Sequence, residues 1–297
     1  MILIKFFSFF YLTLFKKNAT LFLNQHLKEM KGRYMYKKLL LTFTVFTLST
    51  NTFAADITHP FFLPETAHLY ADTNFTYSHS QIKSHTLAKN NRFYTKNAIE
   101  QLKFGILNNF AVIGSISKNW VKNKDLIIGL SEKSHNDLNW NAGLAWNILN
   151  KQTKFQLSSV YGQETPGQIP TKGTYKYIDT EVKLGHQFKK YMPYITAKAH
   201  IPIAQTSQQR NNRWSYSGTV GLYQGKSDVW ALDTALSWNF DRTSTHSRTL
   251  AAEAEASYYL TQNITVGVYG SYMLKGKAKN QTDVYDKTLG AHLRFYF

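Results

Sequence analysis

The feature that most restricts the fold of this chain is an alternation of apolar and polar residues between position 67 and the last residue. In the final ten residues, TLGAHLRFYF, positions 289, 291, 293, 295 and 297 are apolar, and Gly, His, Arg and Tyr lie between them. A period of two is typical of a β-strand with one apolar face. Similar runs lie at 138–148, 230–240, 250–260 and 264–274, and weaker ones near 67–78, 93–106, 110–120, 153–162, 174–188, 192–202 and 213–224.

The connections between these runs alternate in length. Short ones fall at 107–109, 150–152, 189–191, 225–227 and 261–263, whereas long ones occupy about 79–92, 121–135, 163–173, 203–212, 241–248 and 275–283. This count fits consecutive antiparallel hairpins. In a transmembrane barrel the short turns face the periplasm, the long loops face outside, and strands of about nine to eleven residues cross the bilayer.

We therefore predict an all-β fold for residues 67–297: a transmembrane up-and-down antiparallel β-barrel of about 12 strands, with 10–14 as the range. Hydrocarbon offers no partner for free backbone N–H and C=O groups, so the strands must close into a cylinder. Tyr and Phe are abundant, at 19 and 20 residues, and favour strands. A soluble β-sandwich is the main alternative, but its strands are typically shorter, about five or six residues.

The front of the chain has the features of an export signal. Residues 35–54 begin with Lys37 and Lys38, continue with an apolar run and end on Thr52-Phe53-Ala54, which predicts a cleaved signal peptide and a mature start near Ala55. Residues 1–34 are interpreted as an upstream extension or as the result of a mis-assigned translation start, since Met35 could itself begin a complete signal peptide. Residues 55–66 are interpreted as a periplasmic lead-in. The predicted location is the bacterial outer membrane.

The C-terminus resembles that of bacterial Gram-negative outer-membrane β-barrel proteins. Their last strand carries a signal for the barrel assembly machinery, and the residues that fit it in register are Thr288, Gly290, Leu293, Phe295 and the terminal Phe297. The resemblance covers about 67–297 at the level of architecture and identifies no subfamily. It implies outer-membrane lipid and the assembly machinery as partners.

The face opposite the apolar one is predicted to line the lumen, and it carries charges of both signs. These lumen residues are Asp72, Lys103, Asp179, Glu181, Lys183, Lys198, Asp233, Glu253, Glu255 and Arg294. Asp233 is expected beside Glu253 and Glu255, and Arg294 opposite Asp72 across the closing seam. Such charges form either an ion-pair network that fills a narrow barrel or the wall of a wet pore.

The net charge of +17 invites a nucleic-acid interpretation, but the sequence contains no reader motif and spreads its basic residues over separate loops. A basic outer rim suits either the phosphates of lipopolysaccharide or plain solvation. With no cysteine, disulfides and thiolate metal sites are excluded. We expect no cofactor and no metal.

Catalysis requires a nucleophile beside an oriented base. The neighbouring pairs His79-Ser80, Ser84-His85 and His246-Ser247 fall in predicted outer loops, where chance pairs are expected among 10 His. The resulting hypothesis is a non-enzymatic, porin-like passive channel for small hydrophilic solutes. The alternatives are an enzyme acting on outer-membrane lipid or lipopolysaccharide, and a structural or adhesive barrel with a plugged lumen.

Overall fold

The computed structural model describes residues 56–84, 89–127, 129–135, 138–164, 175–204, 214–226, 229–241, 247–278 and 282–297. The predicted signal peptide and the residues before it lie outside these ranges. In the described residues no helix is long and apolar enough to cross a bilayer.

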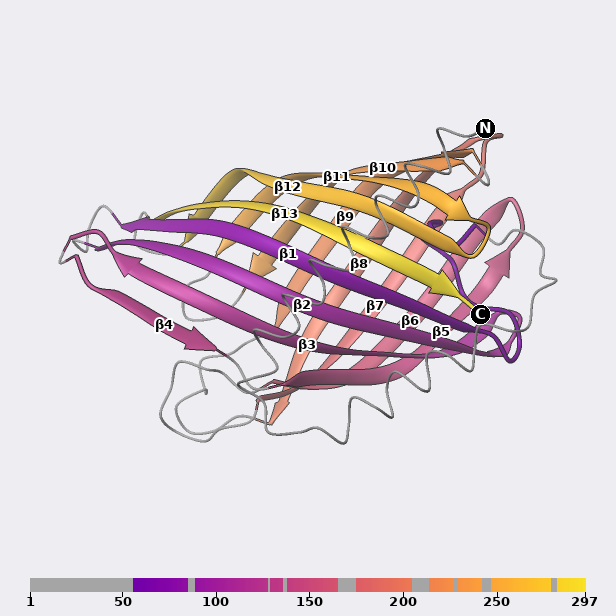
Figure 1. The fold of residues 1–297 in the computed structure, drawn as a ribbon, viewed down its shortest axis with the longest axis horizontal. Coiled ribbons are helices and arrows are strands. Elements are labelled where there is room, and N and C mark those ends of the chain that lie inside the picture. The colour runs from indigo at the N-terminus through magenta and orange to yellow at the C-terminus, as the bar shows by residue number, and fades with distance from the viewer. Residues whose placement is uncertain are drawn as a thin grey trace, which may run out of the picture. The chain divides into compact units, whose positions relative to one another are not determined.

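The strands form one closed antiparallel barrel, in which β1 lies beside β13 (Figure 1). They are β1 (Leu69–Ser84), β2 (Lys89–Leu107), β3 (Phe110–Asp125), β4 (Ser131–His135), β5 (Asn139–Asn150), β6 (Thr153–Glu164), β7 (Tyr175–His186), β8 (Tyr191–Ala204), β9 (Ser215–Lys226), β10 (Trp230–Asp241), β11 (Arg248–Thr261), β12 (Ile264–Ala278) and β13 (Thr282–Tyr296). Apart from β4 and β5, which both pair with β3, each strand pairs with its chain neighbours, and the β1–β13 pair closes the ring. The backbone groups that hydrocarbon would leave without partners therefore find them in the next strand.

The thirteen strands occupy twelve positions in the ring. The first half of β3 pairs with β5, from Phe110 to Ser117, and the second half pairs with β4, from Trp120 to Lys124. β4 and β5 thus share one side of β3, one beyond the other. The predicted barrel of about 12 antiparallel strands is confirmed.

The two faces of the wall differ in polarity as the alternation predicts. On β5, Trp140, Leu144 and Trp146 are exposed on the outer face, while Asn139 and Asn147 are buried on the inner face. Exposed Leu, Val, Ile and Trp side chains continue around the barrel. An outward apolar belt of this kind is what a lipid-facing wall requires.

Several strands are longer than their apolar runs indicate, and β1, β2 and β3 are the longest examples. β1, β2 and β3 contain 16, 19 and 16 residues, so the expected loop at 79–92 is largely a β1–β2 hairpin. Backbone pairing continues there, although both faces carry polar side chains. Alternation therefore ends where the apolar belt ends, not where the strand ends. Figure 1 shows these strands extending beyond their neighbours at the end opposite the C-terminus.

Residues 56–66, which we call the N-terminal segment, pack inside the barrel at the end where the short turns lie. Three apolar side chains of this segment enter three separate clusters on the inner wall: Ile57, Phe61 and Leu63. By the turn-length rule this is the periplasmic end. The sequence identified the stretch only as a lead-in, because its residues show no alternation.

Candidate functional site: the barrel lumen

The closing seam of the barrel is joined on its inner face by an ion-pair cluster. Arg294 on β13 lies with its Nε 3.1 Å from Asp72 Oδ2 on β1, and its Nη1 lies 2.7 Å from Glu255 Oε1 on β11. The Tyr70 hydroxyl also donates to Asp72 Oδ2, at 3.2 Å. Since Arg294 is flanked by two carboxylates and these side chains are largely buried, the cluster fixes three strands relative to one another.

A second cluster lies on β7 and β8. Lys198 Nζ is 2.7 Å from Asp179 Oδ2, and His200 Nδ1 is 2.6 Å from Asp179 Oδ1. The other ring nitrogen of His200 contacts the Tyr175 hydroxyl, and its ring centroid lies 4.8 Å from that of Tyr177. This arrangement exposes a cation and an imidazole to the lumen, with two buried tyrosine rings packed beside them.

The remaining charged residues singled out from the sequence make separate contacts. Asp233 accepts from the Tyr194 hydroxyl at 2.9 and 3.0 Å, and Glu253 accepts from Ser237. Lys183 Nζ lies 3.2 Å from Glu181 Oε2. Register places Asp233 directly opposite Glu255 and Glu181 directly opposite Lys198. The charges therefore form several small groups around the inner wall: mixed-sign groups at Arg294 and at Asp179, and an acidic group where Asp233, Glu253 and Glu255 lie together on β10 and β11.

Wall side chains also satisfy the backbone of the N-terminal segment. The carbonyl of Phe61 accepts from Asn147 Nδ2 at 3.1 Å and from Gln156 Nε2 at 3.3 Å. Lys103 Nζ donates to the Phe62 carbonyl at 3.2 Å, and Lys183 Nζ donates to the Pro60 carbonyl at 3.4 Å. A buried segment without strand pairing needs such partners, because unpaired buried carbonyls are costly.

The start of the segment is held by a carboxylate and hydroxyl network. The Tyr223 hydroxyl donates to Asp56 at 2.7 and 2.8 Å, and the Tyr259 hydroxyl donates to it at 2.9 Å. Thr58 Oγ1 lies 2.8 Å from the Tyr223 hydroxyl. The network connects the segment to β9 and β11. The sequence pattern does not single out these tyrosines, since they lie among outward apolar residues and carry no charge.

His59 is the titratable group of the segment with a shifted pKa. Its Nδ1 accepts the backbone N–H of Phe61 at 3.1 Å, which requires that nitrogen to be unprotonated. Burial, together with the positive charge of Lys154, lowers the pKa of His59 to about 4, although Asp56 and a hydrogen bond with Gln187 oppose the shift. The side chain is therefore neutral at pH 7.

The half of the lumen nearer the long loops contains a polar cavity of about 460 Å³. Hydroxyl, amide and charged side chains from β8 to β11 line it: Lys198, His200, Ser215, Ser217, Thr219, Ser237, Asn239 and Glu253. A second cavity, of about 580 Å³, lies at the short-turn end beside Asp56 and His59. Both have the size of small-molecule sites and a polar lining.

Of the three His–Ser pairs considered from the sequence, His79-Ser80 lies wholly within the described residues, and its two side chains face opposite sides of the strand. His79 lies on β1 and stacks on the ring of Tyr94 at 4.9 Å, and Ser80, the next residue, faces the other side of the strand. His85 and His246 lie outside the described residues. In the part of the chain that the structure describes, no group of three or more His, Asp or Glu is arranged to hold a metal ion.

The residues of the predicted assembly signal lie on β13. Thr288 faces the lumen and lies 2.8 Å from Ser78 Oγ of β1, while Phe295 and Phe297 stack with centroids 5.9 Å apart. Phe297 also exchanges two backbone hydrogen bonds with Leu69, of 2.8 and 3.0 Å. A Cβ at Gly290 would lie 2.3 Å from the Tyr269 ring, so glycine leaves space for that ring. Recognition by the assembly machinery stays a prediction.

One protein-family model matches part of this chain, and several solved structures share its fold. The model of a family described as "Putative MetA-pathway of phenol degradation" matches residues 194–291, about a third of the chain. No protein with a curated function matches.

Solved structures resemble the whole barrel. An outer-membrane channel from Pseudomonas putida F1 is 10% identical, with a TM-score of 0.61 over 84% of this chain and 100% of the other. The transport unit of the autotransporter AIDA-I from Escherichia coli is 11% identical, with a TM-score of 0.47 over 84% and 95%. The Ralstonia pickettii toluene transporter TbuX is 9% identical, with a TM-score of 0.46 over 78% and 90%. The likeness to the P. putida protein is one of fold. The chain has the fold of a 12-stranded outer-membrane β-barrel.

Proposed function

We propose that this barrel is a non-enzymatic outer-membrane channel for small water-soluble solutes, including hydroxylated aromatic compounds. The observation that carries the proposal is the polar cavity of about 460 Å³ in the lumen, lined by hydroxyls, an amide and charges of both signs. A barrel that served only as a scaffold has no need of a roomy hydrophilic interior. The selectivity of such a passage is set by the groups that line it.

The aromatic part of the proposal has two supports. Tyr175 stacks on Tyr177 and on His200 at the inner wall, and the partly exposed His200 ring lies beside hydrogen-bonding groups, which suits a solute with one ring and one hydroxyl. The family that matches residues 194–291 is described by a phenol-degradation pathway, and the similar P. putida protein is described as a channel. Phenol-like compounds are small and water-soluble, so they fit a polar lumen as well.

A closed structural barrel is the second candidate, and the N-terminal segment favours it. Its apolar side chains are buried against three clusters of the inner wall at the periplasmic end. In our proposal the segment is a gate whose displacement opens the mouth. In the alternative it is a permanent part of the core.

Planar-bilayer recordings and proteoliposome uptake of phenol test the two candidates. We expect conductance steps from the native protein, and larger or more frequent steps from Phe61→Ala, which weakens the docking of the segment. Glu253→Gln should reduce the preference for cations over anions, because Glu253 lines the cavity. The matched control is Lys176→Gln, which changes a charge on the outer face of β7.

Absence of conductance steps and of phenol uptake from both native protein and Phe61→Ala would reject the channel in favour of the closed barrel. Conductance that excludes phenol would retain the channel and reject the aromatic solute.

A further inference from the structure

The outer wall formed by β13, β1, β2 and β3 carries a basic patch on its extracellular half. Cross-strand register aligns Lys287, His79, Tyr94 and Lys122 in one row, and Leu289, Tyr77, Lys96 and Trp120 in the next row toward the periplasm. Lys287, Lys96 and Lys122 are exposed. These lysines thus lie at the border between the apolar belt and the outer aqueous phase.

Few carboxylates neutralise this patch. On the outward face of these four strands, within the described residues, the register leaves two: Glu100 and Asp283. Glu100 lies below the lysine rows and accepts from Thr73 Oγ1 at 2.6 Å. Asp283 lies above them, opposite Lys83. The lysine rows therefore have a net positive charge that faces outward.

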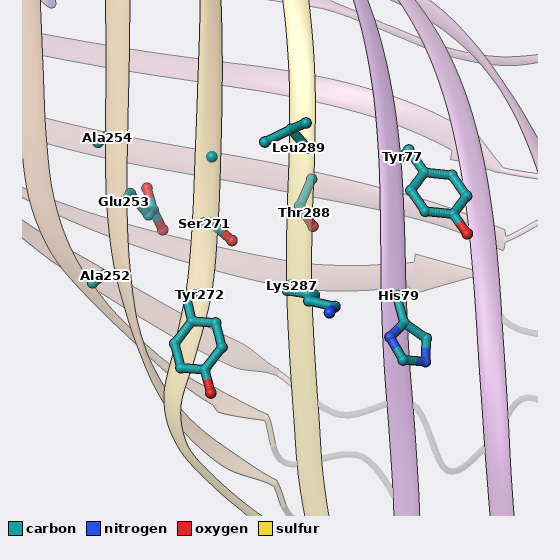
Figure 2. A pocket seen from close by; sticks show the side chains of 11 residues that line it. Tyr77, His79, Ala252, Glu253, Ala254, Ser271, Tyr272, Lys287, Thr288 and Leu289 are labelled. Atoms are coloured by element: carbon teal, nitrogen blue, oxygen red, sulfur yellow. The ribbon is translucent and has the colours of Figure 1, made fainter.

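An apolar groove adjoins the patch. A cavity of about 440 Å³ on the outer wall has a floor of small residues, Ala252, Ala254 and Gly270, and is bordered by the rings of Tyr77 and Tyr272. Figure 2 shows Lys287 between Tyr272 and His79 on three neighbouring strands, and Leu289 further along β13. The groove thus runs beside the same residues that carry the basic rows.

We infer that this surface binds one lipopolysaccharide molecule, with its phosphates on Lys287, Lys96 and Lys122 and an acyl chain in the groove. Three strand spacings separate Lys287 from Lys122, which is roughly 14 Å at about 4.8 Å per strand. That width suits a headgroup with two phosphates on neighbouring sugars better than a single phosphate. Multiple lysines at a low-dielectric border attract such an anion strongly.

The interaction differs from the rim of loops expected from the sequence, because its residues lie on the strands themselves. It is also independent of transport, since every residue named faces away from the lumen. Loss of lipopolysaccharide binding and loss of conductance are therefore separable results.

The test uses the purified full barrel in nanodiscs, titrated with purified lipopolysaccharide and followed by native mass spectrometry. The double variant Lys96→Gln/Lys287→Gln changes two exposed side chains, and we expect at least a tenfold weaker affinity with unchanged conductance. The matched control is Lys176→Gln, an outward lysine on β7, which should bind as the native protein does.

Three results would overturn the inference: native affinity in the double variant, equal weakening in Lys176→Gln, or equal affinity for phosphatidylglycerol, which carries one phosphate. A second variant, Ala254→Trp, fills the groove without changing charge. It should displace the acyl chain and weaken binding by at least about fivefold. Equal binding by Ala254→Trp would confine the contact to the phosphates and overturn the acyl-chain part.

Discussion

Replacement of Phe61 by alanine should undock the N-terminal segment while leaving the barrel folded. The Phe61 ring is 2% exposed and packs on Met192, Tyr194, Tyr223 and Ala231. Removing a buried Phe side chain costs about 3–5 kcal/mol. The strands are held by their own backbone ladder, so this cost falls on the equilibrium between docked and undocked segment.

The expected shift follows from the lower end of that range. The Phe61 carbonyl keeps its two donors, Asn147 and Gln156, in the variant, so only the apolar contribution is lost. A loss of about 3 kcal/mol raises the undocked fraction roughly 150-fold, at about 1.4 kcal/mol per factor of ten. Positions that the docked segment buries should then be accessible to a chemical probe roughly 150-fold more often.

Cysteine labelling gives a direct measurement, because the native chain contains no cysteine. Thr58→Cys places a thiol at a position that is 8% exposed in the docked segment. Labelling of this reporter by a bulky maleimide should be at least about a hundredfold faster with Phe61→Ala added. The matched control is Phe75→Ala, whose ring is 57% exposed on the lipid-facing wall and should leave the rate unchanged.

A labelling rate within twofold of the reporter alone would refute the reasoning. It would mean that the segment stays in place without its central ring. An equal increase in Phe75→Ala would instead attribute the effect to general loosening of the barrel.

Three further predictions use the same reporter or the stability of the barrel. Burial and the charge of Lys154 lower the pKa of His59 to about 4, so the docked segment loses about 2–3 kcal/mol of docking free energy as the pH falls from 6.5 to 4. The labelling rate of Thr58→Cys, divided by that of the exposed Lys151→Cys, should therefore rise over this pH range. The substitution His59→Gln should remove the rise. In Gly105→Ala the new Cβ would lie 1.9 and 2.5 Å from two carbonyl oxygens of the segment, so the labelling rate of Thr58→Cys should increase at least about tenfold. The control Gly270→Ala, whose new Cβ would have its nearest neighbour at 3.7 Å, should leave this rate unchanged. Arg294→Met leaves two carboxylates of the seam without their cation and should lower the free energy of unfolding in urea by about 3–5 kcal/mol. Arg294→Lys should recover part of this loss. If Arg294→Met unfolded at the same urea concentration as the native protein, the structural role of the seam cluster would be contradicted.

The sequence predicts the wall of this barrel well, because one physical requirement governs every strand. Each strand must face lipid on one side and the lumen on the other, so Trp140 and Trp146 alternate with asparagines that turn inward. The same periodicity aligned Asp72 with Arg294 across the seam, where the structure has Arg294 Nε 3.1 Å from Asp72 Oδ2. The strand ends are less predictable, since pairing beyond the apolar belt needs no alternation.

The N-terminal segment was not predictable by the same means. Its apolar residues, Ile57, Phe61 and Leu63, follow no period of two or of 3.6, so neither template detects them. Their burial depends on inner-wall residues more than a hundred positions away, such as Met192 and Tyr259. A signal was present nonetheless, since a stretch this apolar that is neither strand nor leader must still be removed from water.

The lumen charges and the segment are coupled, and the coupling bears on selectivity. Lys103 and Lys183 donate to carbonyls of the segment, at 3.2 and 3.4 Å, and so are partly engaged by the closed mouth. If the segment leaves, both ammonium groups face the open passage, and Asp56 leaves with it. The open mouth then gains positive character while the cavity above it keeps Glu253. We therefore expect the weakly conducting closed state to prefer cations and the open state of Phe61→Ala to shift toward anions, which reversal potentials in a salt gradient measure directly. An unchanged reversal potential alongside increased conductance would mean that the lysines do not line the passage that opens.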